Sequence, residues 1–187
     1  MTLTLRHAVA DDLRAVGALH QRSRVAAYAS FLPPEALAQP TPEMMGEYWT
    51  QRWTYERDDH LMTVAERDGR LVGFTYLGPD ELDGVVDPTA AMLRAIHLDP
   101  AEQGRGTGRV LMVDALDTMR SWGRTRATLW VLRDNVHARR FYERGGWTAT
   151  GDVRDDQIGP VLVPQLRYAR ELGVPPVTDR VDPSPEG

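Results

Sequence analysis

The sequence predicts one α/β domain with a mixed central sheet, and three observations support this fold class. Apolar and polar residues alternate over residues 2–7, and strand-like apolar segments return at 61–65 and 71–77. Two more apolar runs, at 93–98 and 127–132, are separated by a glycine cluster and an amphipathic helix pattern. Strand, helix and strand in this order make parallel neighbours, so the sheet combines parallel and antiparallel pairs.

Length and composition fit one globular domain. The chain has 187 residues, of which 42% are hydrophobic and 26% are charged. Acidic residues stand where a signal peptide needs its apolar segment, and no apolar run is long enough for a membrane span. We therefore expect a cytoplasmic protein that does not bind membranes. Residues 1–170 are expected to form the folded domain, and the proline-rich residues 171–187 a disordered tail.

Charge and residue usage exclude several classes of function. The net charge of −5 argues against general nucleic-acid binding, which depends on a basic surface. The chain has no cysteine, so it has no disulfide framework, thiolate metal site or cysteine nucleophile. Its five histidines show no metal-ligand spacing, and we expect no metal site.

The first half of the chain is expected to place helices beside the first strand. Apolar residues follow helical spacing from Asp11 to Tyr28. A second helix is predicted to begin at Thr41, which suits the N-cap, with Pro42 at the first helical position.

Turn signals divide the remaining strands. Asp-Gly at residues 68–69, between two apolar runs, predicts a hairpin. Residues 78–90 are rich in acidic residues and are expected to form a loop that faces solvent or attracts a cationic amine. Two last strands are expected from Trp147 and over 161–168, on either side of a loop at 152–159.

A glycine cluster after the strand at 93–98 predicts a phosphate-binding turn. Gly104, Gly106 and Gly108 let the backbone adopt positive φ and approach a ligand closely. The first amides of the following helix have no intrahelical partner and suit a phosphate. A Walker loop is disfavoured because the chain contains no lysine, and a dinucleotide fingerprint because Gly108 leads into apolar residues.

Two motifs together resemble the GCN5-related N-acetyltransferase (GNAT) family. QGRGTG at residues 103–108 is similar to that family's acyl-CoA pyrophosphate loop. Residues 133–147 resemble its second signature, an Asn, then Ala three residues on, then Phe-Tyr and a Gly-aromatic close. Both occur in the family's order and spacing, and the resemblance covers roughly residues 3–170. It implies an N-acetyltransferase domain with about seven strands, in which splayed parallel strands form an acyl-CoA cleft.

The resemblance implies acetyl-CoA as cosubstrate and direct attack by a primary amine of a small molecule or peptide. Backbone groups of Ile96 and Leu98 would align the pantetheine arm, and the Leu98 amide would stabilise the oxyanion. Tyr142 would protonate the departing thiolate, because phenol and thiol pKa values differ by only about 1.5 units. The full set of expected coenzyme contacts is Ile96, His97, Leu98, Gln103, Gly104, Arg105, Gly106, Thr107, Gly108, Arg109, Asn135, Arg139 and Tyr142.

Helical spacing gives the second motif a geometric meaning. Asn135, Arg139 and Tyr142 lie at i, i+4 and i+7 and share one helix face, whereas Ala138 and Phe141 turn to the core. A structural role stays open for two of these residues, because Asn135 also suits a helix cap and Tyr142 a plain core or surface aromatic.

The general base is not identified by the sequence. Many relatives carry a Glu where this chain has Met92, which cannot accept a proton. His97 has a suitable pKa, but strand alternation places it opposite Ile96 and Leu98. A water chain, Glu47 or Glu81 stays open as the base. The alternative function is an acyl-CoA-binding sensor without turnover, and the acyl length, the acceptor and a homodimeric state also stay open.

Overall fold

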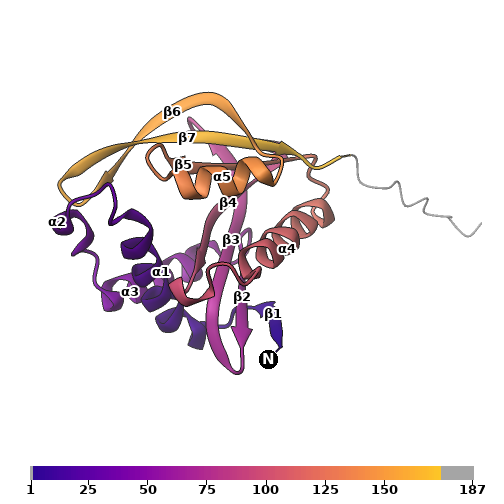
Figure 1. The fold of residues 1–187 in the computed structure, drawn as a ribbon. Helices are drawn as coiled ribbons and strands as arrows, with labels where there is room; N and C mark the ends of the chain where they lie inside the picture. Colours follow the sequence, from indigo (N-terminus) through magenta and orange to yellow (C-terminus); the bar gives the residue numbers. More distant parts are fainter. Residues whose placement is uncertain (1, 174–187) are drawn as a thin grey trace, which may run out of the picture.

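A mixed sheet runs through the computed structural model, which describes residues 2–173 of the chain (Figure 1). Its seven strands are ordered β1-β2-β3-β4-β5-β7-β6. The strands are β1 (Leu3–His7), β2 (Leu61–Arg67), β3 (Arg70–Leu82), β4 (Val85–Leu98), β5 (Arg126–Leu132), β6 (Thr148–Ile158) and β7 (Val161–Glu171). The helices are α1 (Leu13–Tyr28), α2 (Pro34–Leu37), α3 (Pro42–Glu56), α4 (Thr107–Ser121) and α5 (Val136–Arg144), with 3-10 turns η1 (Ala10–Asp12) and η2 (Pro100–Glu102). The predicted fold class and the parallel pairing of β4 with β5 are confirmed.

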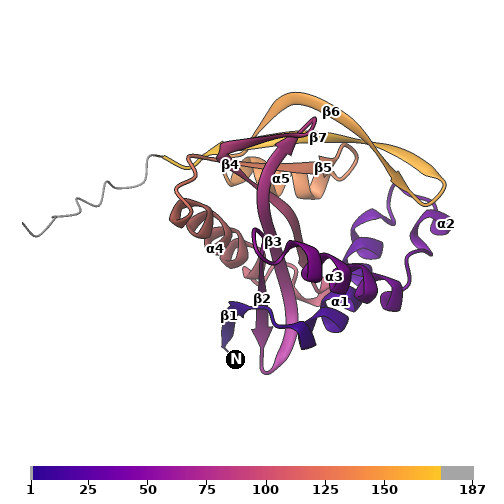
Figure 2. The same ribbon diagram turned by 180° about the vertical axis from the view of Figure 1, so that it is seen from behind.

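Helices cover both faces of the sheet, so the core has two halves (Figures 1 and 2). On one face α4 contacts β3 and β4, and α5 lies on the same side. This half of the core includes Leu93, Leu116, Met119, Leu129, Trp147 and Tyr168. On the other face α1 packs against α3 and contacts β3 and β4. That half includes Leu13, Val16, Leu19, Trp49, Phe74 and Tyr76.

Local sequence signals set several boundaries as predicted. Thr41 Oγ1 accepts a hydrogen bond from the Met44 amide at 3.3 Å, and Pro42 occupies the first position of α3. Asp68 and Gly69 adopt φ of 52° and 76°, the positive values that a tight two-residue hairpin turn requires. The predicted hairpin of β2 and β3 is therefore confirmed.

The prediction of a loop at residues 78–90 is wrong. β3 continues to Leu82, and β4 already begins at Val85. Asp83 and Gly84 form the turn with φ of 53° and 79°, so a second Asp-Gly hairpin stands where a loop was predicted.

Pro79 and Asp80 are typical of loops, but the structure accommodates both in β3. Pro79 lies past the end of β2, whose Leu61 pairs with Leu77, and next to a register shift, where a strand tolerates proline. Asp80 is 2% exposed and forms an ion pair with Arg167 at 2.6 Å, so it faces neither solvent nor a free amine.

The C-terminal hairpin is longer than predicted. Residues 152–158 of the expected loop belong to β6, and a register shift between Ala149 and Val153 absorbs the extra residues. β7 ends at Glu171, and Leu172 is buried in the core, so the fold passes the expected boundary at residue 170. The rest of the expected tail, residues 174–187, lies outside the described residues. No helix between residues 2 and 173 has the length and apolar character needed to cross a membrane.

Candidate functional site

The sheet splits where β4 passes Arg94. β4 and β5 pair only over residues 90–93 and 126–129, after which β4 follows β3 and β5 follows β7. Arg94 is the extra residue of a bulge between the paired positions Leu93 and Ala95. A bulge bends its strand, so the two parallel strands diverge from this point.

Main-chain groups of β4 are left without a partner strand in the split. The Asp99 amide donates to the Val72 carbonyl of β3 at 2.8 Å. Hydrogen-bonding direction alternates along a strand, so the amides and carbonyls of Leu98 and Ile96 point away from β3, toward the side that β5 has left. These are the two residues predicted to align an extended ligand arm.

The split opens into a cleft of about 380 Å³ with two walls. The first, called the α5 wall, includes Leu98, Gln103, Gly108, Asn135, Phe141 and Tyr142, and Ile96 lines the cleft beside them. The second, called the α1 wall, lies on the face covered by α1 and α3 and includes His20, Tyr28, Arg52, Arg94, His97 and Asp156. A ligand in the cleft therefore contacts both faces of the sheet.

The glycine loop leads from η2 into α4 at the α5 wall. Gly104 and Gly106 have φ of 77° and 82°, which glycine adopts without strain. A Cβ added at either residue would meet no atom within 4 Å, so both border open space. Gly108 has a different role, because its Cβ would lie 3.0 Å from Leu98 Cδ1. The third glycine therefore lets α4 approach β4 closely.

Several main-chain amides of this loop lack a protein partner. Within residues 2–173 no hydrogen bond is made by the amides of Gly104, Gly106, Thr107 and Gly108. They lie at the N-terminus of a 15-residue helix, where the dipole adds positive potential. Such a cluster of free amides at a helix N-terminus has the chemistry to bind an anion.

Three residues of this loop, Arg105, Thr107 and Arg109, offer fewer groups to a ligand than the sequence predicted. The Arg105 amide donates to the Glu102 carbonyl at 3.2 Å, and the Arg109 amide donates to the Gly106 carbonyl at 3.0 Å. These two residues therefore offer only their side chains. The Thr107 hydroxyl is buried and donates to Glu102 at 2.8 Å, so Thr107 offers only its amide.

The helix α5 brings one stripe of residues to the cleft. Asn135 is the N-cap, because its Oδ1 accepts from the Ala138 amide at 3.2 Å, and it also lines the cleft. Ala138 and Phe141, predicted to face only the core, line the cleft as well. Arg139 does not line it, because its guanidinium donates to Tyr168 Oη and to the Arg133 carbonyl, both at 3.1 Å.

Tyr142 stands at the inner end of this stripe. It is 8% exposed, and its hydroxyl makes no hydrogen bond with any residue of the described part of the chain. Burial, with a smaller effect of Tyr28, raises the pKa of the Tyr142 phenol. The side chain is therefore protonated at neutral pH and free to donate one hydrogen bond into the cleft.

The comparison with protein families covers both motifs. The model of the acetyltransferase (GNAT) family matches residues 24–147, more than half of the chain. The chain belongs to the GNAT family. The matched region contains the glycine loop, the split of β4 and β5, and α5.

Relatives and solved structures agree with this assignment. An uncharacterized N-acetyltransferase of Methanocaldococcus jannaschii is 31% identical over 99 residues, covering 53% of this chain and 44% of its own length. A mycothiol acetyltransferase of Thermomonospora curvata is 39% identical over 87 residues, covering 46% and 27%. The chain thus spans less than half of the length of these two relatives. The PaiA N-acetyltransferase of Thermoplasma acidophilum, solved with coenzyme A, superimposes with a TM-score of 0.72 at 21% identity, over 91% of this chain and 99% of that one.

The two acids left open as the base, Glu47 and Glu81, do not reach the cleft, and neither does Met92, which stands where many relatives carry a Glu. Met92 is buried between Gly78 and Thr128, in the part of β4 that still pairs with β5. Glu47 and Glu81 are exposed, on α3 and near the tip of the β3–β4 hairpin, and neither lines the cleft. The methionine at position 92 is therefore no evidence for or against a general base in the cleft.

Two neighbouring histidines, with ring planes tilted by 36°, line the α1 wall instead. His97 points away from Ile96 and Leu98, as strand alternation predicts, but the cleft also opens on that face. Its ring centroid lies 3.9 Å from that of His20, and its Nδ1 lies 3.2 Å from Ser23 Oγ. His20 Nδ1 accepts a hydrogen bond from Trp49 Nε1 at 3.1 Å.

Burial keeps both imidazoles neutral. It lowers the pKa of His97 to about 4, with Arg24 adding to the effect, and lowers the pKa of His20 as well, with contributions from His97 and Arg24. Sequence reasoning missed His20, Arg94 and Asp156. No local motif marks these residues, since they come from α1, β4 and β6 and meet only through the sheet topology.

Proposed function

We propose that this chain transfers an acetyl group from acetyl-CoA to a primary amine of a small molecule or peptide by direct attack. The observation that carries the proposal is the unpaired amides at Gly104 and 106–108, which continue into a cleft bordered by free main-chain groups of β4. A diphosphate carries the negatively charged acceptors that the unpaired amides lack within the described residues. An extended pantetheine arm can form hydrogen bonds with the free main-chain groups of β4.

The donor half of the proposal uses the glycine loop and β4. The free amides would hold the diphosphate, and Arg105 and Arg109, both exposed, would add charge-assisted hydrogen bonds. The open space in front of Gly104 and Gly106 admits the phosphates without displacing a side chain. Leu98 would hold the pantetheine arm through its main chain.

Acetyl-CoA supplies a thioester whose carbonyl carbon accepts the amine. The Leu98 amide points into the split and would stabilise negative charge on the thioester oxygen. Tyr142 would donate its proton, or a strong hydrogen bond, to the departing sulfur. Because burial raises the pKa of Tyr142, the phenol enters the reaction protonated, but the gap to the thiol pKa is wider than the about 1.5 units expected from the sequence, which favours a strong hydrogen bond to the sulfur over complete proton transfer.

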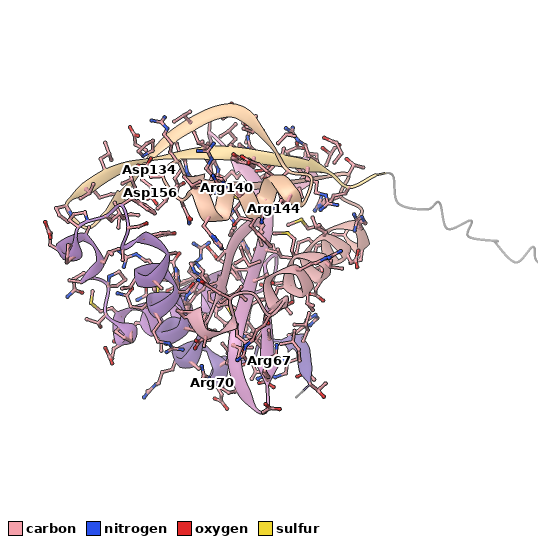
Figure 3. All side chains as sticks on the ribbon, in the orientation of Figure 1. Arg67, Arg70, Asp134, Arg140, Arg144 and Asp156 are labelled. Atoms are coloured by element: carbon pink, nitrogen blue, oxygen red, sulfur yellow. The ribbon has the colours of Figure 1, made fainter. Side chains whose placement is uncertain are left out.

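Two side chains on the α1 wall can take the proton that the amine loses. His97 is neutral at pH 7 and lines the cleft. Asp156 also lines the cleft, and its Oδ2 accepts a hydrogen bond from Gln165 Nε2 at 2.9 Å. Figure 3 shows Asp156 at the end of the β6–β7 arch nearest α1 and α2.

Coenzyme A binding is tested first, by calorimetry. Arg109→Glu removes a cation beside the free amides and should weaken binding at least about tenfold without a change in melting temperature. Arg57→Glu, exposed beyond α3, is the matched control and should bind normally. If the wild-type protein gives no binding heat, the proposal is wrong.

Turnover is tested by following thiol release from acetyl-CoA with a panel of amino acids, aminoglycosides, polyamines and peptides. Release above the hydrolysis rate with any acceptor supports the enzyme and discards the sensor that only binds acyl-CoA. Tight coenzyme A binding with no release for the whole panel would favour the sensor. Size-exclusion chromatography with light scattering tests whether the chain forms a homodimer.

A further inference from the structure

One arginine of the α1 wall has no acidic partner. Arg94 lines the cleft, and its guanidinium makes a single hydrogen bond among residues 2–173, from Nη2 to the Pro79 carbonyl at 3.0 Å. Its Nε is buried without a partner, and no carboxylate of the described chain lies within 4.0 Å of it. Nη1 makes no hydrogen bond with the described residues.

Neighbouring arginines differ from Arg94 in this respect. Arg52 also lines the cleft, but its Nε donates to Glu56 at 2.7 Å. Arg167 is held by Asp80 through Nη2, at 2.6 and 2.8 Å. Both charges are therefore compensated within the protein, whereas the charge of Arg94 is not.

The position of Arg94 places its charge beside the reacting groups. It is the bulge residue at which β4 and β5 part, two residues before Ile96. A partly buried cation without a counter-ion is unfavourable, and an anionic oxygen supplied by a ligand removes that cost. The side chain lies on the α1 wall of the cleft.

A carboxylate lines the same wall. Asp156 accepts a hydrogen bond from Gln165 and forms no ion pair with the described residues. Arg94 and Asp156 thus present one unpaired cation and one unpaired anion to the same cleft. Opposite charges on one small molecule, an ammonium and a carboxylate, complement this pair.

We propose that the acceptor is a small amino acid-like molecule, an amine that also carries a carboxylate, and that Arg94 binds the carboxylate. This inference rests on the proposed acetyl transfer and names the acceptor class of the same site. The cleft of about 380 Å³ is shared with the pantetheine arm, so the acceptor is small. Tyr28, Trp49 and Trp130 border it and provide apolar contacts for its carbon chain.

Acetyl transfer to matched acceptors tests the inference. Each L-amino acid is compared with its own amide, which keeps the amine and removes the negative charge. For the preferred side chain, kcat/KM for the acid should exceed that for the amide about 100-fold, the range of one charge-assisted contact. Equal rates for acids and amides across the set would overturn the inference and leave acetyl transfer itself intact.

Variants assign the preference to one residue. Arg94→Gln should reduce the acid-to-amide ratio to about one, and Arg94→Lys should restore part of it, which shows that the charge rather than a folding defect is responsible. Arg57→Gln, on the surface, removes the same charge and should leave the ratio unchanged. An equal loss for acid and amide in Arg94→Gln would contradict the proposed role.

A binding measurement separates this inference from the proposed function. Equilibrium dialysis of amino acids and their amides against protein saturated with coenzyme A requires no turnover. Binding of acids that is stronger than binding of amides and is lost in Arg94→Gln supports the inference even if thiol release fails. Absence of acid binding in the presence of bound coenzyme A overturns it, whatever the outcome with acetyl-CoA.

Discussion

The carboxylate of Glu102 accepts a hydrogen bond from Thr107 Oγ1 at 2.8 Å and another from Arg67 Nη2 at 3.0 Å. Glu102 and Thr107 are 5% and 0% exposed, so this contact lies under the glycine loop rather than on its surface. Arg67 comes from the end of β2, at the hairpin visible at the bottom of Figure 3. Through Glu102 and Arg67, the glycine loop is therefore anchored to β2, in the antiparallel part of the sheet.

Removal of the Thr107 hydroxyl tests this anchor. Thr107→Val keeps the shape of the side chain but leaves the buried Glu102 with one hydrogen bond fewer, which should cost about 1–3 kcal/mol of unfolding free energy. The amides of the first turn of α4 should become less well ordered, and the Kd for coenzyme A should rise about tenfold. Thr118→Val on the same helix is the control. An unchanged Kd would show that the anchor does not position the amides.

Tyr142→Phe tests the proposed acid. The hydroxyl has no partner among the described residues, so its loss leaves the packing intact and removes only the proton donor. We expect turnover to fall about 100-fold or more while the Kd for coenzyme A changes less than about threefold. Tyr55→Phe, at a side chain that is 85% exposed, should have no effect. Unchanged turnover would remove Tyr142 from the mechanism.

Sequence patterns predicted the elements whose signals are local. Thr41 caps α3, and Asp68 and Gly69 turn the first hairpin, because each signal acts within a few residues. The same reasoning gave a wrong prediction for residues 78–90. Acidic residues and a proline are typical of loops, but Asp80 is buried by an arginine 87 positions away. A pattern of neighbouring residues cannot reveal Arg167 as the partner of Asp80.

The two walls of the cleft show the same division. The α5 wall comes from motifs that are continuous in sequence, and Gln103, Gly108 and Tyr142 line the cleft, although their contacts with a coenzyme stay predictions. The α1 wall joins α1, α3, β4 and β6, so neither His20 nor Asp156 had a recognisable spacing. Arg139 shows the limit of helical periodicity, because one nearby hydroxyl, that of Tyr168, draws it away from the cleft.

The acid stability of the protein should depend on His97. Its pKa of about 4 in the folded chain lies below the ordinary value of 6.5, mainly because the half-buried imidazole is desolvated in the wall of the cleft. As the pH falls from about 6.5 to about 4, the unfolded chain binds a proton that folded His97 does not, so the free energy of unfolding decreases over this interval.

His97→Asn removes this proton uptake. The variant should lose about 1–3 kcal/mol less than the wild type between pH 7 and pH 4, measured by urea denaturation at each pH. His7→Asn, at an exposed position of β1, is the control. The variant His97→Asn also tests the identity of the general base. Loss of turnover at pH 8 in His97→Asn but not in Asp156→Asn would show that the imidazole accepts the proton of the amine. Parallel stability curves for wild type and His97→Asn would contradict the proposed burial effect.

The pair of Asp80 and Arg167 should be the most costly interaction to break on the α1 side of the sheet. The two side chains are 2% and 7% exposed and join β3 to β7, which are not neighbours in the sheet. Asp80→Asn leaves the buried guanidinium with only the half-exposed Asp152, 3.7 Å from Nη1, as an acidic partner, which should cost about 3–5 kcal/mol, a large fraction of the stability of a domain of this size. The double variant Asp80→Leu, Arg167→Met removes both charges and should recover most of that loss. Chemical denaturation of the wild type, Asp80→Leu, Arg167→Met and the double variant measures the coupling, and additive losses would show that the two buried charges act independently.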